Sequence, residues 1–167
     1  MSASFETAVN GLIAELSSFE RNRDKISSCR AALARLRQSI QNPIHAAPYV
    51  APFAVNVSGD QEDLLYLAAG LFVINPIHTE GVSFGAAFRH LREKSDSIEK
   101  RFSMVLAARK EQLPDLLRHS IKLLGSHGLG LDWKMLLHDA DRWDLVDSAV
   151  QRRWARDFYR EPARSAN

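Results

Sequence analysis

The sequence lacks the features that mark secreted and membrane-spanning proteins. It contains one cysteine, Cys29, so no disulfide can form within the chain, and a lone thiol suits a reducing compartment. The first ten residues include an acid, Glu6, but neither Lys nor Arg, which does not fit a secretory signal. The longest apolar run, residues 64–74, is too short to cross a bilayer. We therefore predict a cytoplasmic protein with no membrane segment.

Basic residues are missing from one long stretch, because there is no Lys or Arg between Gln38 and Phe88. Residues 21–37 hold six Lys and Arg against one acid, and residues 89–167 hold sixteen against twelve. The net charge of +2 therefore hides two basic regions that flank a base-free middle. Such unevenness bears on binding partners and not on the fold. Arginine outnumbers lysine, and arginine is the better residue for gripping phosphates and stacking on bases.

No segment shows the alternating pattern of a convincing β-strand. Apolar residues instead recur at helical spacing, for example from Phe5 to Leu16 and from Ile26 to Ile40. Three prolines within residues 42–58 limit that connector to short helical turns. The sequence therefore predicts an all-α fold of about eight helices.

Capping residues and helix breakers predict the boundaries of the later helices. Asp60 is a candidate cap for a helix over 61–74, and Asp132 is a candidate cap for the seventh helix. Pro114 and Gly125 bracket the sixth helix. We predict three regions: an N-terminal helical region with its proline-rich connector (1–80), a C-terminal helical bundle (81–160) and a disordered tail (161–167).

Two of the predicted helices carry arginines along one face. In the second helix Arg23, Arg30 and Arg37 repeat every seven residues, which predicts a nearly straight basic stripe. The last helix, over about 145–159, has apolar residues at a spacing of four that are predicted to face the core: Val146, Val150, Trp154 and Phe158. Its arginines are predicted to point away from that core: Arg152, Arg156 and Arg160, with Arg153 beside them. Such faces are either solvated surfaces with weak ion pairs or a groove for nucleic acid.

The sequence also lacks the motifs of catalytic sites. It has no phosphate-binding loop and no G-x-S-x-G turn, and Cys29 lies on an apolar helical stripe where a small buried side chain is expected. The best metal candidates are His127, His138, Asp139 and Asp141, but the two histidines lack the i,i+4 spacing of helical ligands. We interpret the aspartates of this region as a solvated acidic patch: Asp139, Asp141, Asp144 and Asp147. We predict no enzyme activity, no cofactor and no metal, with a metal-dependent nuclease as the open alternative.

Several motifs occur in an order that is similar to a known family. They are "ALARLR" and "APYVAPF", then "GVSFGAAF", "SIEKRFSMVLAARKEQLPDLLRHSIKLL", "LDWKMLLHDADRW" and "VQRRWARDFY". Over residues 29–159 this ordered set resembles the small subunit of the type I-E CRISPR Cascade surveillance complex, the CasB family. None of the motifs is a catalytic signature. The resemblance implies an N-terminal helical part and a C-terminal helical bundle.

The resemblance further implies a non-catalytic subunit that binds a guide-RNA ribonucleoprotein. Its expected partners are the large subunit, the backbone proteins around the guide RNA and a second copy of itself. Its basic surface is expected to hold the displaced single-stranded DNA of the R-loop without sequence preference. The implied contact residues are Arg35 and Arg37; Arg101, Arg109 and Arg118; Arg152, Arg153 and Arg156; and then Lys110 and Lys122. Arg30 joins them on the geometry of its stripe alone. The alternative is a protein scaffold with only incidental nucleic-acid contact.

Overall fold

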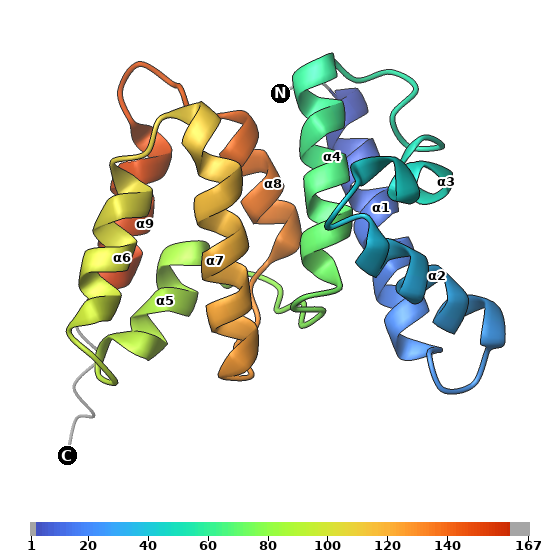
Figure 1. The fold of residues 1–167 in the computed structure, drawn as a ribbon. Coiled ribbons are helices and arrows are strands. Elements are labelled where there is room, and N and C mark those ends of the chain that lie inside the picture. Colours follow the sequence, from blue (N-terminus) through green and yellow to red (C-terminus); the bar gives the residue numbers. More distant parts are fainter. Residues whose placement is uncertain (1–2, 161–167) are drawn as a thin grey trace.

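The computed structural model describes residues 3–160, with side chains from Ser4 onward, and consists of helices in this range (Figure 1). The α-helices are α1 (Ala3–Arg21), α2 (Ser27–Gln38), α3 (Ala47–Val50), α4 (Gly59–Phe72), α5 (Phe84–Arg92), α6 (Ser97–Leu106), α7 (Leu113–Ser126), α8 (Trp133–Asp141) and α9 (Ala149–Tyr159). Two short 3-10 helices are η1 (Pro43–Ala46) and η2 (Lys110–Gln112). Strand pairing within the described range is limited to one isolated bridge, between His78 and Leu131. The all-α prediction is confirmed, and the predicted tail lies outside the described residues.

Two helix starts illustrate how far the sequence signals hold. Asp132 caps α8 as predicted, because its carboxylate accepts hydrogen bonds from the backbone N–H groups of Lys134 and Met135. Helix α4 is capped by Ser58 and not by Asp60. The Ser58 hydroxyl and the Gln61 side chain each accept from the other's backbone N–H, which satisfies two donors at once, whereas Asp60 lies in the first turn.

The last helix is shorter than predicted. It begins at Ala149, after Ser148 takes up a left-handed conformation with φ of 51°. Val146 therefore lies in the preceding turn and is fully exposed, so its predicted place in the core is wrong. Val150, Trp154 and Phe158 do face the core, as predicted. No described helix combines the length and apolar character that crossing a membrane requires.

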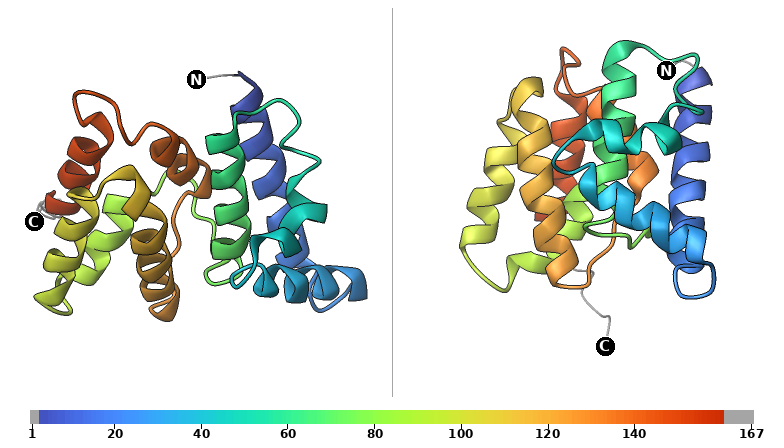
Figure 2. Two further views of the ribbon diagram at one scale, coloured as in Figure 1. Left: turned by 45° about the horizontal axis from the view of Figure 1, so that its top comes forward. Right: turned by 45° about the vertical axis from the view of Figure 1, so that its right-hand side comes forward.

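Helices α1–α4 gather on one side of the molecule and α5, α6 and α9 on the other, with α7 and α8 between them (Figures 1 and 2). Helix α8 packs on α1 and α4. Its His138 meets the ring of Phe5 at 5.7 Å, and its Trp133 meets Phe72 at 5.6 Å, measured between ring centroids. One cluster of buried apolar side chains runs from α1 to α9 across residue 80. The division into two regions at that residue stays a prediction.

Aromatic rings fill the space between α5, α6 and α9. The ring of Phe84 stacks on Trp154 with centroids 4.4 Å apart, and Phe102 stacks on Phe158 at 4.1 Å. Phe88 lies 5.9 Å from Phe102 and closes the cluster from the α5 side. Aromatic pairs at such separations stabilise a core beyond the area they bury. This cluster therefore fixes how the three helices are turned about their axes.

Helices α5 and α9 approach so closely that only glycine fits at the crossing. A Cβ added to Gly85 would lie 2.1 Å from the backbone oxygen of Trp154. Because that neighbour is backbone, it cannot move away as a flexible side chain would. The glycine thus sets the distance between the two helices.

We predict that Gly85→Ala lowers the free energy of unfolding by about 2 kcal/mol or more, because α5 and α9 must separate to admit the methyl group. Urea unfolding of the purified protein measures this loss. Gly59→Ala is the matched control, since a Cβ there meets nothing within 4 Å, and its expected change is between zero and a gain of about 1 kcal/mol. Equal stability of the two variants would contradict the close helix crossing.

Candidate nucleic-acid interface

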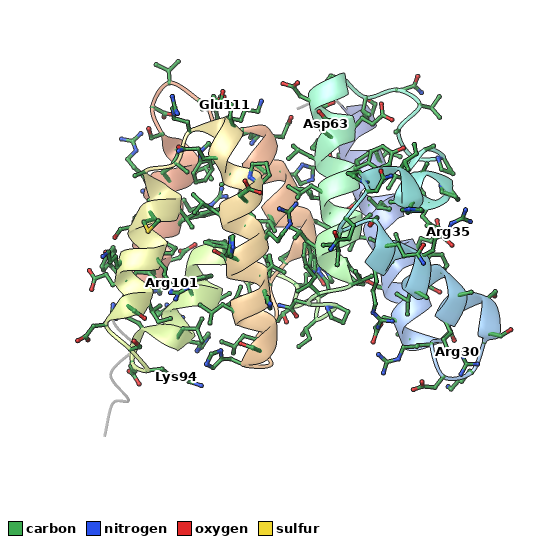
Figure 3. All side chains as sticks on the ribbon, viewed as in Figure 1. Arg30, Arg35, Asp63, Lys94, Arg101 and Glu111 are labelled. Atoms are coloured by element: carbon green, nitrogen blue, oxygen red, sulfur yellow. The ribbon has the colours of Figure 1, made fainter. Side chains whose placement is uncertain are left out.

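The structure distributes the predicted basic residues over three places. The first set lies on α2: Arg30, Arg35 and Arg37. The second lies on α6, α7 and the segment between them: Arg101, Arg109, Lys110, Arg118 and Lys122. The third lies on α9: Arg152, Arg153 and Arg156. Arg30 and Arg35 sit at one end of the molecule and Arg101 near the other, so the sets do not form one compact patch (Figure 3).

The α2 set is exposed because the opposite face of the helix is buried. Cys29, Leu33 and Leu36 face the core, as the apolar stripe predicted. Arg30, Arg35 and Arg37 are exposed and make no ion pair with any described residue. The predicted stripe loses one member, since α2 begins at Ser27. Arg23 lies in the turn before it and pairs with Glu20 at 3.1 Å.

Arg101 stands at the edge of a groove between α6 and α7. The groove holds about 470 Å³ and is lined by apolar side chains that include Met104, Val105 and Leu116. Lys100 and His119 line it beside Arg101. The resemblance to a family did not single out these two residues. Lys100 directly precedes Arg101, so charge clustering is a signal by which the sequence could have identified it. His119 becomes relevant only when α6 and α7 are placed side by side.

Arg118 lines a second groove, on the other side of α7. This groove also holds about 470 Å³ and runs between α7, α4 and the segment around η1. Arg118 pairs with Asp115 of its own helix at 2.8 Å, and Asp63 lines the same groove. Nearby, Lys110 pairs with Asp60 at 3.3 Å. These pairs are partly exposed, so they weaken the local positive potential without abolishing it.

Arg109 and Lys122 complete the second set. Both are exposed and make no ion pair with any residue in the described range. Of the second set, Arg101, Arg109 and Lys122 are therefore the cations whose charge the fold itself leaves uncompensated.

The α9 set separates into exposed residues and one, Arg153, that is partly buried by a contact with α8. Arg156 is exposed without an ion pair to a described residue, and Arg152 pairs with Asp147 at 3.2 Å on the surface. Arg153 instead contacts Asp139, which is only 5% exposed and also accepts a 2.7 Å hydrogen bond from Trp154 Nε1. The prediction that Asp139 belongs to a solvated patch is wrong, because α9 folds back over the end of α8 and covers it. Because Arg153 is already paired with Asp139, it is less available to bind a ligand.

The candidate metal residues do not come together. Among the described residues, no group of three or more His, Cys, Asp or Glu side chains is placed to hold a metal ion. His127 Nδ1 lies 3.0 Å from the backbone oxygen of Leu123, on the surface. His138 packs on Phe5 instead, and burial lowers its pKa below the ordinary value of 6.5 while Glu6 opposes that shift.

Comparison with known proteins identifies relatives that match most of the chain. The model of a family described as CRISPR-associated protein Cse2 matches residues 30–159. A CRISPR-associated protein Cse2 from Thermus thermophilus is 35% identical over 136 residues, which are 77% of this chain and 79% of that protein.

Solved structures show the same arrangement. The crystal structure of a Cse2-family protein from Thermus thermophilus is similar with a TM-score of 0.74 and 29% identity, over 88% of this chain and 97% of that one. A chain of a CRISPR RNA-guided surveillance complex is similar with a TM-score of 0.73, over 95% of this chain and 94% of that one. Its identity is 22%, so this last likeness concerns the fold alone.

We predict that Asp139→Ala lowers the free energy of unfolding by about 2–3 kcal/mol, because Arg153 and the Trp154 N–H both lose their acceptor. Arg153 is partly exposed and water can solvate it, which keeps the loss below that of a fully buried pair. Urea unfolding measures the change. Asp144→Ala, at an exposed position without an ion pair to a described residue, is expected to stay within about 0.5 kcal/mol of the unchanged protein. If Asp139→Ala were as stable as Asp144→Ala, the structural role of Asp139 would be contradicted.

We predict that stability falls with acidification below about pH 6.5 and that His138 contributes to the fall. The unfolded chain takes up a proton at His138 near its ordinary pKa of 6.5, while the folded chain, whose His138 pKa is lowered, takes it up only at a lower pH. The unfolded state therefore binds more protons, and protonation favours unfolding. Free energies of unfolding at pH 7.5 and 5.5 test this. His138→Gln is expected to show a smaller difference between the two pH values than His127→Gln, the exposed control; identical differences would contradict it.

Proposed function

Since this chain belongs to the Cse2 family of CRISPR-associated proteins, we propose that it is a non-catalytic subunit of a type I-E CRISPR RNA-guided surveillance complex, Cascade. The likeness of its fold to a chain of a CRISPR RNA-guided surveillance complex supports this assignment. In the proposed setting the protein works in the cytoplasm, beside a second copy of itself. It bridges the large subunit and the backbone proteins that surround the guide RNA.

Its proposed task is to hold the displaced DNA strand of the R-loop. Exchanging a DNA duplex for a guide–target heteroduplex is nearly balanced in free energy. A subunit that captures the displaced strand opposes re-annealing and shifts that balance toward the R-loop. Such capture needs cations along a path and no reading of base sequence, because the phosphates are the same at every step.

The observation that carries the proposal is a set of cations on the surface of neighbouring helices. Arg101 and Arg35 are exposed and make no ion pair with a described residue. Arg118 makes only a weak, partly exposed pair within its own helix. Arg101 lines the groove on one side of α7, and Arg118 lines the groove on the other. Across the face shown in Figure 1 the helices follow one another as α6, α7, α4 and α2. A strand crossing this face passes Arg101 and Arg118 and reaches the exposed arginines of α2, such as Arg35. We leave Arg153 out of this path because Asp139 engages it.

Exposed apolar residues support the proposed bridging of other subunits. Val146, in the turn before α9, is fully exposed, and Val55 and Ile44, between α2 and α4, are 76% and 63% exposed. Burying such side chains against another protein removes apolar surface from water, which favours association. A scaffold whose basic faces dock on proteins alone is therefore the second candidate function.

We predict that the purified protein binds a fluorescent single-stranded DNA in a salt-dependent manner and that Arg101→Glu/Arg109→Glu/Arg118→Glu weakens this binding. Each phosphate contact contributes about 0.7 to the slope of log K against log salt concentration for a single strand, so the slope is expected to decrease in the variant. Fluorescence anisotropy across a salt series measures both quantities.

The control for net charge is Lys25→Glu/Lys134→Glu/Arg142→Glu, which makes the same change of charge at positions outside the proposed path. We expect it to bind more tightly than the test variant. Equal weakening in the two variants would show that only net charge matters. Absence of binding by the unchanged protein would favour the scaffold, with any DNA contact arising only in the assembled complex.

A further inference from the structure

The groove between α6 and α7 has a composition that phosphate binding alone does not explain. Its interior is apolar, with Leu116 and Leu123 contributed by α7 and Met104 and Val105 by α6. Met104 is 54% exposed, so the groove leaves a large apolar side chain open to water. A track for phosphates needs cations and has no use for an apolar lining.

The charged side chains that line the groove favour a negatively charged ligand. Lys100 and Arg101 line the groove, and neither makes an ion pair with a described residue. Among the described residues, no Asp or Glu belongs to its lining. The groove on the other side of α7 differs, since Asp63 lines it and its Arg118 is paired with Asp115. The α6–α7 groove therefore suits a ligand that combines an anionic group with an apolar, compact body.

Two planar side chains from facing helices indicate more closely which class of ligand the groove suits. Arg101 on α6 and His119 on α7 both line the groove. His119 Nδ1 lies 2.8 Å from the backbone oxygen of Asp115, so the tautomer with a proton on Nδ1 donates to that carbonyl and holds the ring against its own helix. Imidazole rings and guanidinium planes are the surfaces on which unpaired nucleobases stack. This hydrogen bond favours one orientation of the ring before any ligand arrives.

We propose that the α6–α7 groove binds a nucleobase of the captured single-stranded DNA, with the base against the apolar lining between His119 and Arg101 and the adjoining phosphate at Lys100. The proposal rests on the proposed function, because it takes its ligand from the displaced strand. At about 470 Å³ the groove falls in the size range of small-ligand sites, roughly 300–1,000 Å³. Base stacking also adds affinity that added salt does not screen, which pure phosphate contacts cannot supply.

The first test compares two proteins, the unchanged chain and His119→Ala, each with two strands, one that carries bases and one that is abasic. We expect His119→Ala to bind an oligothymidine strand roughly five- to ten-fold more weakly than the unchanged protein. An abasic strand of equal length is expected to bind both proteins equally. His127→Ala is the matched control: His127 follows the last turn of the same helix, its ring contacts a backbone oxygen four residues earlier in the same way, and it does not line the groove.

The second test observes the groove directly through its methionine. In protein labelled at the methionine methyl carbons, the Met104 resonance is expected to shift on addition of oligothymidine through the ring current of an inserted base. The abasic strand is expected to leave it in place, and Met135 on α8 serves as the internal control.

The outcomes separate the two proposals. Strand binding with an unmoved Met104 and an unaffected His119→Ala variant would overturn the base site and leave the proposed function intact. Equal shifts with both strands would also overturn it, because they would assign the groove to phosphate. Binding of neither strand would overturn the proposed function for the isolated chain, and the base site with it. A fourth outcome is a Met104 resonance that stays in place with the strand and shifts when a partner subunit is added without DNA. That result would overturn the base site and assign the groove to protein docking.

Discussion

The aromatic packing between α5, α6 and α9 is the interaction on which the rest of this structure depends. Phe84 and Trp154 stack across the helix crossing that Gly85 makes possible, and Phe102 joins them from α6. Since Phe102 is buried, the residue directly before it, Arg101, is turned outward to the groove edge. A contact made entirely inside the protein thus determines where a charged side chain meets a ligand.

The same packing joins the last helix to the central one. Trp154 stacks on Phe84 with its ring and donates its Nε1–H to Asp139 on α8, so one side chain connects α5, α8 and α9. Arg153 supplies the counter-charge that a buried carboxylate needs. Helix α8 in turn packs on α1 and α4. A chain of contacts therefore holds the basic helices on both sides of the molecule in a fixed relation, which a shared path for one strand requires.

The cations of the surface fall into those that the fold neutralises and those that it leaves free. Pairs such as Arg118 with Asp115 and Lys110 with Asp60 are exposed and weak, so a phosphate can compete for the cation. Arg153 differs because its carboxylate partner, Asp139, is buried. Moving the arginine to a ligand would leave that buried negative charge without its counter-charge. A count of all basic residues therefore overstates the surface available for binding. The cations that a ligand can reach are fewer than the cations of the chain, because residues such as Arg153 are held by partners within the fold.

The sequence alone determined the helical class, several helix ends and the buried stripes, because periodicity and capping are local properties that neighbouring residues decide. It indicated Asp132 as a cap and Cys29 as a core residue, and the order of its motifs identified the family. Only the tertiary structure decided that Arg152 lies on the surface while the adjacent Arg153 turns to Asp139, and that Val146 leaves the core when α9 starts at Ala149. Likewise His119 and Arg101 meet at one groove although the sequence separates them. Such relations arise from the distance between helices, which side-chain packing sets and helical spacing does not encode.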